Sequence, residues 1–127
     1  MLKKDNIQGG GTLQSLELAH KAVDIIVEKK GLDILLLDIT PVSLLADYFI
    51  LASGDSERQI KAIIEEIETQ VKHDLRAIPL HVDGEPDSGW VILDYGGVII
   101  HIFSPEVRAY YRLEEMWNEA RVVVKLQ

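Results

Sequence analysis

The 127-residue sequence contains no cysteine, which excludes disulfides, thiolate metal ligands and cysteine nucleophiles. Basic residues are scarce too, with 13 Lys and Arg against 21 Asp and Glu and a formal net charge of −8. A protein that holds nucleic acid mainly by neutralising phosphates needs clustered Lys and Arg, so little direct nucleic-acid contact is expected. The acidic balance favours a basic protein as partner instead.

The sequence also has no apolar run near the roughly 20 residues that a membrane span requires, and runs such as 34–37 and 98–100 are far shorter. Its polar start carries no apolar signal core. We therefore expect a soluble, cytoplasmic protein with no membrane partner. Residues 1–11 end in three glycines and contain little to bury, so we expect a flexible leader there.

Three segments are predicted to be helical. After Thr12, an N-cap residue, apolar side chains recur at helical spacing until Gly31 provides a stop. Ser56 and Gln59 have the spacing of a capping box, in which both side chains satisfy backbone donors at a helix start. Ser104-Pro105 combines a cap with a proline at the first helical position, and the helix after it offers apolar and aromatic contacts as far as Trp117.

Short apolar runs predict five strands, at 34–37, 48–53, 78–82, 90–95 and 98–103. The order of these elements predicts an α/β domain of the α+β two-layer type, with a mixed five-stranded sheet and helices mainly on one face. We expect the domain to span residues 12–120. The C-terminal tail, 121–127, is given no role.

Gly96-Gly97 between the last two strands is a hairpin signal that also predicts the pairing. Side chains alternate between the two faces of a sheet, and pairing of Tyr95 with Val98 decides which residues of the two strands share a face. The face beneath the helices then carries Val91, Leu93, Tyr95, Val98, Ile100 and Ile102. The other face carries Trp90, Ile92, Asp94, Ile99, His101 and Phe103. That second face is either another core or an exposed docking surface, and the pattern leaves both open.

Metal and anion sites have weak support. His81 and Asp83 share a strand face and could meet an ion with Asp47, Asp94 or His101, but isolated strand histidines are more often structural. The 53–56 turn, where a strand meets a helix, could receive an anion, yet helix capping already explains it. We therefore predict no metal and no cofactor.

Catalytic patterns are missing from the sequence. It has no G-x-S-x-G nucleophile elbow, and it has no D-x-D pair of the kind that metal-dependent phosphoryl transfer requires. These observations favour a binding domain over an enzyme. Two alternatives remain: an enzyme or nucleotide binder that uses the 53–56 turn and Asp94, and a homodimer formed through the aromatic face.

Four blocks of sequence are more specific than these generic patterns. They are 46–54 (ADYFILASG) with Ser56 and Arg58-Gln59, 89–96 (GWVILDYG), 101–103 (HIF), and Arg108-x-x-Tyr111-x-Leu113-Glu114-x-x-Trp117. In this colinear order, across about residues 13–120, they resemble the ribosomal silencing factor family, also called the Iojap family.

The resemblance implies a factor that binds the large ribosomal subunit at its fourteenth protein, blocks joining of the small subunit and represses translation when nutrients are short. A role in large-subunit maturation is a further expectation. The family's fold is similar to a nucleotidyltransferase core without the catalytic carboxylates, which agrees with the missing D-x-D pair.

The resemblance also implies a partner-binding surface. By this resemblance the surface consists of Trp90, Asp94, Tyr95 and His101 with their neighbours Ile92 and Ile99, and of Tyr111, Glu114 and Trp117 of the last helix. One position departs from the family, since many members have an acid after the hairpin glycine where this chain has Gly97. The departure removes a charge from the tip of the hairpin.

Overall fold

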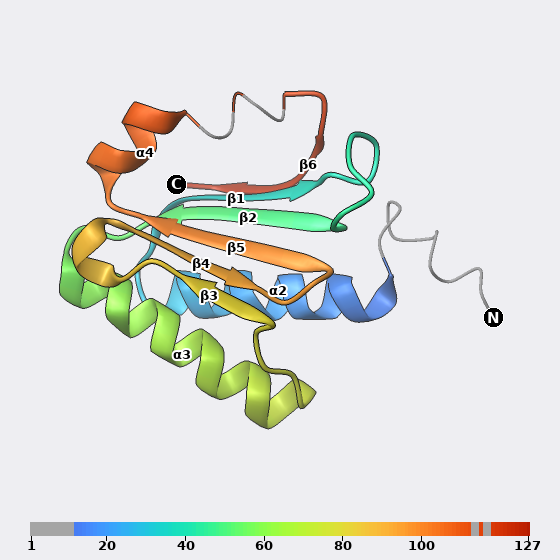
Figure 1. Cartoon of the computed structure of the whole chain (residues 1–127), viewed down its shortest axis with the longest axis horizontal. Helices are drawn as coiled ribbons and strands as arrows, with labels where there is room; N and C mark the ends of the chain where they lie inside the picture. The colour runs from blue at the N-terminus through green and yellow to red at the C-terminus, as the bar shows by residue number, and fades with distance from the viewer. Residues whose placement is uncertain (1–11, 113–114, 116–117) are drawn as a thin grey trace.

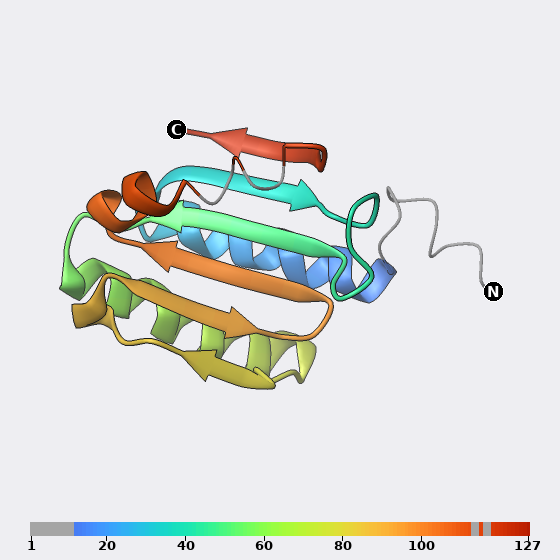
Figure 2. The same ribbon diagram turned by 45° about the horizontal axis from the view of Figure 1, so that its top comes forward.

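A computed structural model describes residues 12–112, 115 and 118–127 (Figure 1). The predicted leader lies outside the described residues, as do Glu114 and Trp117 of the predicted partner surface. The described chain forms one sheet with two long helices against one of its faces (Figures 1 and 2). This arrangement confirms the mixed α/β class and the placement of the helices mainly on one face.

The three described α-helices begin at the predicted caps. Helix α2 (Leu13–Glu28) starts after Thr12, whose hydroxyl accepts from the Ser15 N–H at 3.0 Å. Helix α3 (Glu57–Leu75) starts after Ser56, whose hydroxyl accepts from the Gln59 N–H at 3.1 Å. Helix α4 (Pro105–Tyr111) starts after Ser104 and is shorter than expected, because Arg112 takes a left-handed conformation and ends it.

The Gln59 side chain links helices α2 and α3. Its side-chain oxygen accepts from the Asp55 N–H, at 2.5 Å, so the capping box closes on the residue before Ser56. Its amide nitrogen donates to the carbonyls of Lys29 and Lys30, at 3.1 and 2.9 Å. One side chain therefore satisfies backbone groups at the start of α3 and at the end of α2.

The sheet has the strand order β3-β4-β5-β2-β1-β6. The strands are β1 (Leu32–Asp38), β2 (Tyr48–Ser53), β3 (His81–Asp83), β4 (Trp90–Asp94), β5 (Val98–Phe103) and β6 (Arg121–Leu126). Among the described strands only the central β2–β5 pair is parallel, and the other neighbours are antiparallel. The predicted hairpin register is confirmed, with Asp94 opposite Ile99, Ile92 opposite His101 and Trp90 opposite Phe103.

The predicted count of five strands is wrong, because the tail forms a sixth strand, β6, at the edge beside β1. An ion pair fixes it there: the Arg121 guanidinium donates to the fully buried Asp38 carboxylate at 2.9 Å. β3 is also displaced from its predicted range and begins at His81. Pro79 has no N–H for a strand ladder, which accounts for the later start.

The sheet has an apolar cluster on each face. The larger one packs beneath α2 and α3 and includes the hairpin residues predicted for that side. The smaller one, on the opposite face, contains Leu37, Leu51 and Phe103, and Val107 of α4 packs against it. α4 therefore lies on the face opposite α3 (Figures 1 and 2).

A candidate docking face on the β4–β5 hairpin

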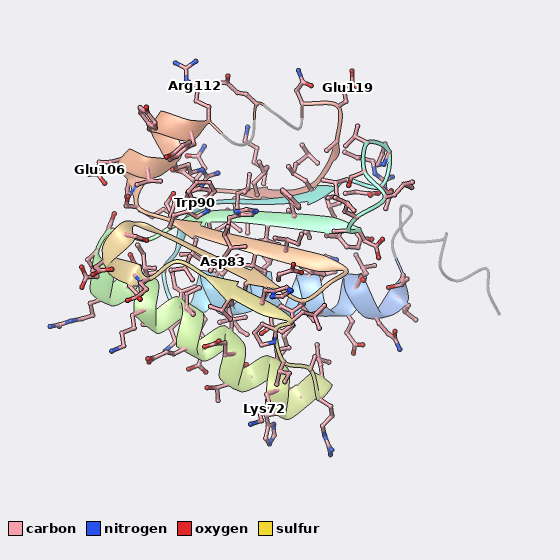
Figure 3. The ribbon with its side chains drawn as sticks, viewed as in Figure 1. Lys72, Asp83, Trp90, Glu106, Arg112 and Glu119 are labelled. Atoms are coloured by element: carbon pink, nitrogen blue, oxygen red, sulfur yellow. The ribbon has the colours of Figure 1, made fainter. Side chains whose placement is uncertain are left out.

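Six side chains of the hairpin point away from α2 and α3. We call this set the hairpin face, and it consists of Trp90, Ile92, Asp94, Ile99, His101 and Phe103. Phe103 and His101 are buried, whereas the other four are half-buried. At the edge of the sheet the face continues onto His81 and Asp83, which pair with Asp94 and Ile92 and are exposed. Figure 3 labels Asp83 on β3 and Trp90 on β4.

Trp90 stands at the centre of an aromatic cluster. Its ring stacks on Phe103 with centroids 5.1 Å apart and lies 5.0 Å from the ring of Tyr111. Its indole N–H donates to Nδ1 of His101 at 3.1 Å. These contacts fix the orientation of the Trp90 ring while part of it stays in contact with solvent.

His101 is a neutral packing residue. It is only 6% exposed, and burial lowers its pKa from 6.5 to about 4. Because Nδ1 accepts the Trp90 hydrogen bond, the ring proton of the neutral form sits on Nε2, which is buried and has no hydrogen-bond partner among the described atoms. The ring lies 5.0 Å from Phe49 and 5.8 Å from Phe103, so it behaves as a third aromatic ring.

The described residues that the sequence offers for a metal or an anion site are not arranged as such a site. Within the described part of the chain, no group of three or more His, Asp or Glu residues is placed to hold a metal ion. His81 and Asp83 are exposed at the sheet edge, whereas His101 is buried and uses Nδ1 for Trp90. In the 53–56 turn, the Ser56 hydroxyl caps α3 and the Ser53 hydroxyl accepts from Arg108 at 3.1 Å.

Tyr95 lies apart from the rest of the predicted surface. Its ring packs against the cluster beneath α2 and α3, and its hydroxyl is buried without a hydrogen-bond partner in the described structure. Burial, helped by the negative charge of Glu68, raises its pKa to about 12. Strand alternation predicts this placement, whereas the family resemblance groups Tyr95 with Trp90.

The other predicted residues that the structure describes come together. Tyr111 of α4 is 51% exposed and joins the hairpin face through its contact with Trp90. Asp94 accepts from the Gly96 N–H at 2.8 Å, which fixes the turn. Phe49 belongs to the same cluster but was not predicted, because its position beside Ile99 depends on the parallel β2–β5 pairing between strands distant in sequence.

Gly97 permits a close approach of the hairpin tip to α2. A Cβ at this position would overlap the Ser15 hydroxyl and lie 3.5 Å from a carboxylate oxygen of Asp47. The Asp47 carboxylate in turn accepts from the Thr12 N–H at 3.3 Å. A side chain at this position would therefore require the Ser15 hydroxyl to shift, and the acid that many family members are expected to carry here would face the Asp47 carboxylate.

The comparisons with known proteins decide the family. A family model described as "Ribosomal silencing factor during starvation" matches residues 12–127, which include β6. The ribosomal silencing factor RsfS of Bacillus subtilis is 39% identical over 106 residues, covering 83% of this chain and 86% of its own. The chain belongs to the ribosomal silencing factor family. The predicted family is therefore confirmed.

Two further relatives agree with this assignment. A crystal structure of a Chromobacterium violaceum protein matches with a TM-score of 0.77 at 32% identity, covering 81% of this chain and 85% of that one. Mouse "mitochondrial assembly of ribosomal large subunit protein 1" is 30% identical over 98 residues, covering 76% of this chain and 43% of its own. Ribosomal silencing factors are not a known enzyme class. No described helix is long and apolar enough to cross a membrane.

Proposed function

We propose that this ribosomal silencing factor binds the large ribosomal subunit through the hairpin face, at the subunit's fourteenth protein. Bound there, it blocks joining of the small subunit and represses translation under nutrient limitation. Family membership supports the ribosomal target. The observation that carries the choice of surface is the Trp90 cluster, in which a half-buried aromatic ring is held by Phe103, His101 and Tyr111.

The hairpin face combines features of a protein-binding surface. Interfaces are enriched in aromatic residues, and their strongest contributions come from Trp, Tyr and Arg that fill pockets in the partner. The rim of this face carries the carboxylates of Asp83 and Asp94, which would meet the basic side chains of a ribosomal protein. Trp90 and Tyr111 supply the apolar anchor, and the carboxylates set orientation and the rate of encounter.

The proposed mechanism is steric and requires no catalytic step, cofactor or metal. Once the hairpin face is docked, the rest of the domain occupies space that the small subunit needs. The decisive measurement is co-sedimentation of the purified protein with separated large subunits, followed by small subunits at magnesium concentrations that promote association. We expect binding to large subunits and fewer joined ribosomes. Absence of binding at micromolar protein would refute the proposal.

A homodimer through the same face is the competing use of these residues. Light scattering across a dilution series measures it directly. If the hairpin face serves the ribosome, a Tyr111→Ala variant should lose binding to large subunits without changing the molar mass in solution. Loss of a dimer in that variant, with subunit binding unchanged, would assign the face to self-association instead.

A role in large-subunit maturation is a second proposal, supported by the name of the mouse relative, an assembly protein of the mitochondrial large subunit. Its test is sucrose-gradient sedimentation of ribosomes from cells that lack the protein. Large-subunit precursors should accumulate even in rich medium, where silencing is not needed. A normal gradient profile in rich medium would refute this second role.

A further inference from the structure

A crevice of about 820 Å³ lies on the face of the sheet that carries α4, between α4, β1 and β6. Its described lining includes Ser53 at the end of β2 and Pro105 just after β5. None of the partner-surface residues that the structure describes is among that lining. A volume of this size accommodates a small organic molecule.

The position of the crevice follows from the chain topology. β2 and β5 are neighbouring parallel strands, and the helices that follow them, α3 and α4, pack on opposite faces of the sheet. Where connections from adjacent parallel strands leave to opposite faces, a crevice opens beyond the carboxyl ends of the strands. Ligands of open α/β sheets bind preferentially in such crevices.

The described side chains that line the crevice carry a small excess of positive charge, although the chain as a whole is acidic. Its described lining carries the cations of Arg108, Arg112 and Lys125 against the carboxylates of Asp33 and Glu115. Arg112 is paired with Glu115 at 3.8 Å, so the excess comes from Arg108 and Lys125 against Asp33. The formal side-chain charge is 3 − 2 = +1, in a chain whose net charge is −8. Within an acidic molecule, this concentration of positive charge favours an anion.

A buried arginine forms the inner wall. Arg108 is only 9% exposed, and its guanidinium donates to the Asp33 carbonyl at 2.6 Å and to the Ser53 hydroxyl at 3.1 Å. These bonds hold the positive charge at the base of the crevice rather than in bulk solvent. Arg112 and Lys125 are exposed at its mouth.

Part of the remaining wall is apolar. The side chains of Leu35 and Leu37 from β1 and of Val122 from β6 line it, together with Ala109 of α4. An anionic head group could face the cations while an apolar body lies along β1 and β6. We propose that this crevice binds a small organic anion that has a carboxylate or phosphate head group and an apolar body.

The test uses 1-anilinonaphthalene-8-sulfonate as the probe, since it combines an apolar body with an anionic group and becomes fluorescent in an apolar site. Arg112→Ala and Lys125→Ala should each weaken its binding at least fivefold, because each removes a cation at the mouth of the crevice. Arg58→Ala is the matched control: it removes an exposed arginine on α3, outside the lining, and should leave the affinity unchanged.

A second arm replaces the probe by N-phenyl-1-naphthylamine, which has the apolar body without the anionic group and should bind at least fivefold more weakly. Inorganic phosphate and hexanoate, each added at constant ionic strength, then compete with the anionic probe. Displacement by phosphate assigns a phosphate head group, and displacement by hexanoate assigns a carboxylate. If neither compound displaces the probe, the proposal is overturned.

Amide NMR shifts locate the probe independently of these variants. The shifts should concentrate on α4 and β6. Leu44 and Leu45 are the most exposed large apolar residues described, so they form the main competing site for an apolar dye. Shifts confined to residues 42–46, or equal affinities in the Arg112→Ala, Lys125→Ala and Arg58→Ala variants, would also overturn the proposal.

Discussion

At the scale of single residues, the arrangement around Trp90 explains how one side chain can belong to a folded cluster and still be available to a partner. Phe103 supports one side of the ring, Tyr111 lies 5.0 Å away, and His101 accepts its only polar hydrogen. The ring therefore loses little conformational freedom when a partner binds. Because Trp90 packs against the smaller apolar cluster, the larger cluster does not depend on it.

Trp90→Ala should weaken binding to large subunits at least tenfold, since a buried interfacial tryptophan contributes about 2 kcal/mol or more. Circular dichroism should still show folded helices. Leu45→Ala is the matched control, because it removes an exposed apolar side chain outside the hairpin face. Quantitative co-sedimentation measures both variants. Equal affinity of Trp90→Ala and wild type would remove Trp90 from the interface, and an unfolded variant would assign it to the core.

His101 predicts a pH dependence of stability. Its pKa is about 4 in the folded protein and near 6.5 when unfolded, so the unfolded state binds more protons between these values. Stability should therefore fall as pH drops from about 7 to about 5, by about 2 kcal/mol. His101→Gln should remove most of this loss in urea denaturation. His81→Gln, which changes an exposed imidazole on β3, should retain it.

At the scale of elements, β6 contributes an edge strand whose attachment depends on one buried carboxylate. Asp38 accepts from the Thr40 N–H and hydroxyl, at 3.0 and 2.6 Å, and from Arg121 at 2.9 Å. Removing Arg121 would leave part of a fully buried anion without its charged donor. β6 also forms one wall of the crevice beside α4, so its attachment shapes that crevice.

Arg121→Ala should lower the free energy of unfolding by about 2 kcal/mol, because the buried carboxylate loses a charge-assisted hydrogen bond. Hydrogen exchange should accelerate first in the amides of β6. Lys125→Ala on the same strand is the control, and its exposed side chain should contribute less than about 0.5 kcal/mol. Urea denaturation compares the two variants. Equal stability would mean that β6 is held by its backbone pairing with β1 alone.

Elements set by local signals could be predicted from the sequence, whereas those set by distant pairings could not. Thr12, Ser56 and Ser104 cap helices through contacts within three residues, and the Gly96-Gly97 turn fixes the hairpin register. β6 could not be predicted, because its pairing joins β1 to a segment more than 80 residues later in the chain. The left-handed turn at Arg112 that ends α4 likewise has no glycine to indicate it.

In the candidate site, too, local patterns could be predicted from the sequence and contacts between distant segments could not. Alternation along β4 and β5 predicts the hairpin face, and it also places Tyr95 beneath the helices, where the structure has it. Phe49 joins the cluster through the β2–β5 pairing, which the sequence does not indicate. Arg108 occurs in a matching block, but its burial against Ser53 depends on α4 crossing the end of β2.

At the scale of the whole molecule, charge acts on docking in two opposed ways. A net charge of −8 repels the phosphates of ribosomal RNA, while the carboxylates of Asp83 and Asp94 on the rim attract a basic protein. Attraction at the rim is local and decides orientation, whereas repulsion acts on the molecule as a whole. Replacing one carboxylate at a time by an amide separates the two effects. Every such substitution changes the net charge by the same amount, so two variants can differ only in the local attraction at the rim.

Asp83→Asn should slow association with large subunits, because it removes attraction at the rim. Asp24→Asn, on an exposed position of α2 outside the hairpin face, should leave the association rate unchanged or raise it, since it only reduces repulsion. Stopped-flow measurements from about 50 to about 300 mM salt should show the association of the wild-type protein slowing by up to about tenfold. The association of Asp83→Asn should slow by a smaller factor over the same range. Equal rates for both variants at every salt concentration would mean that docking is not steered by the rim of the hairpin face.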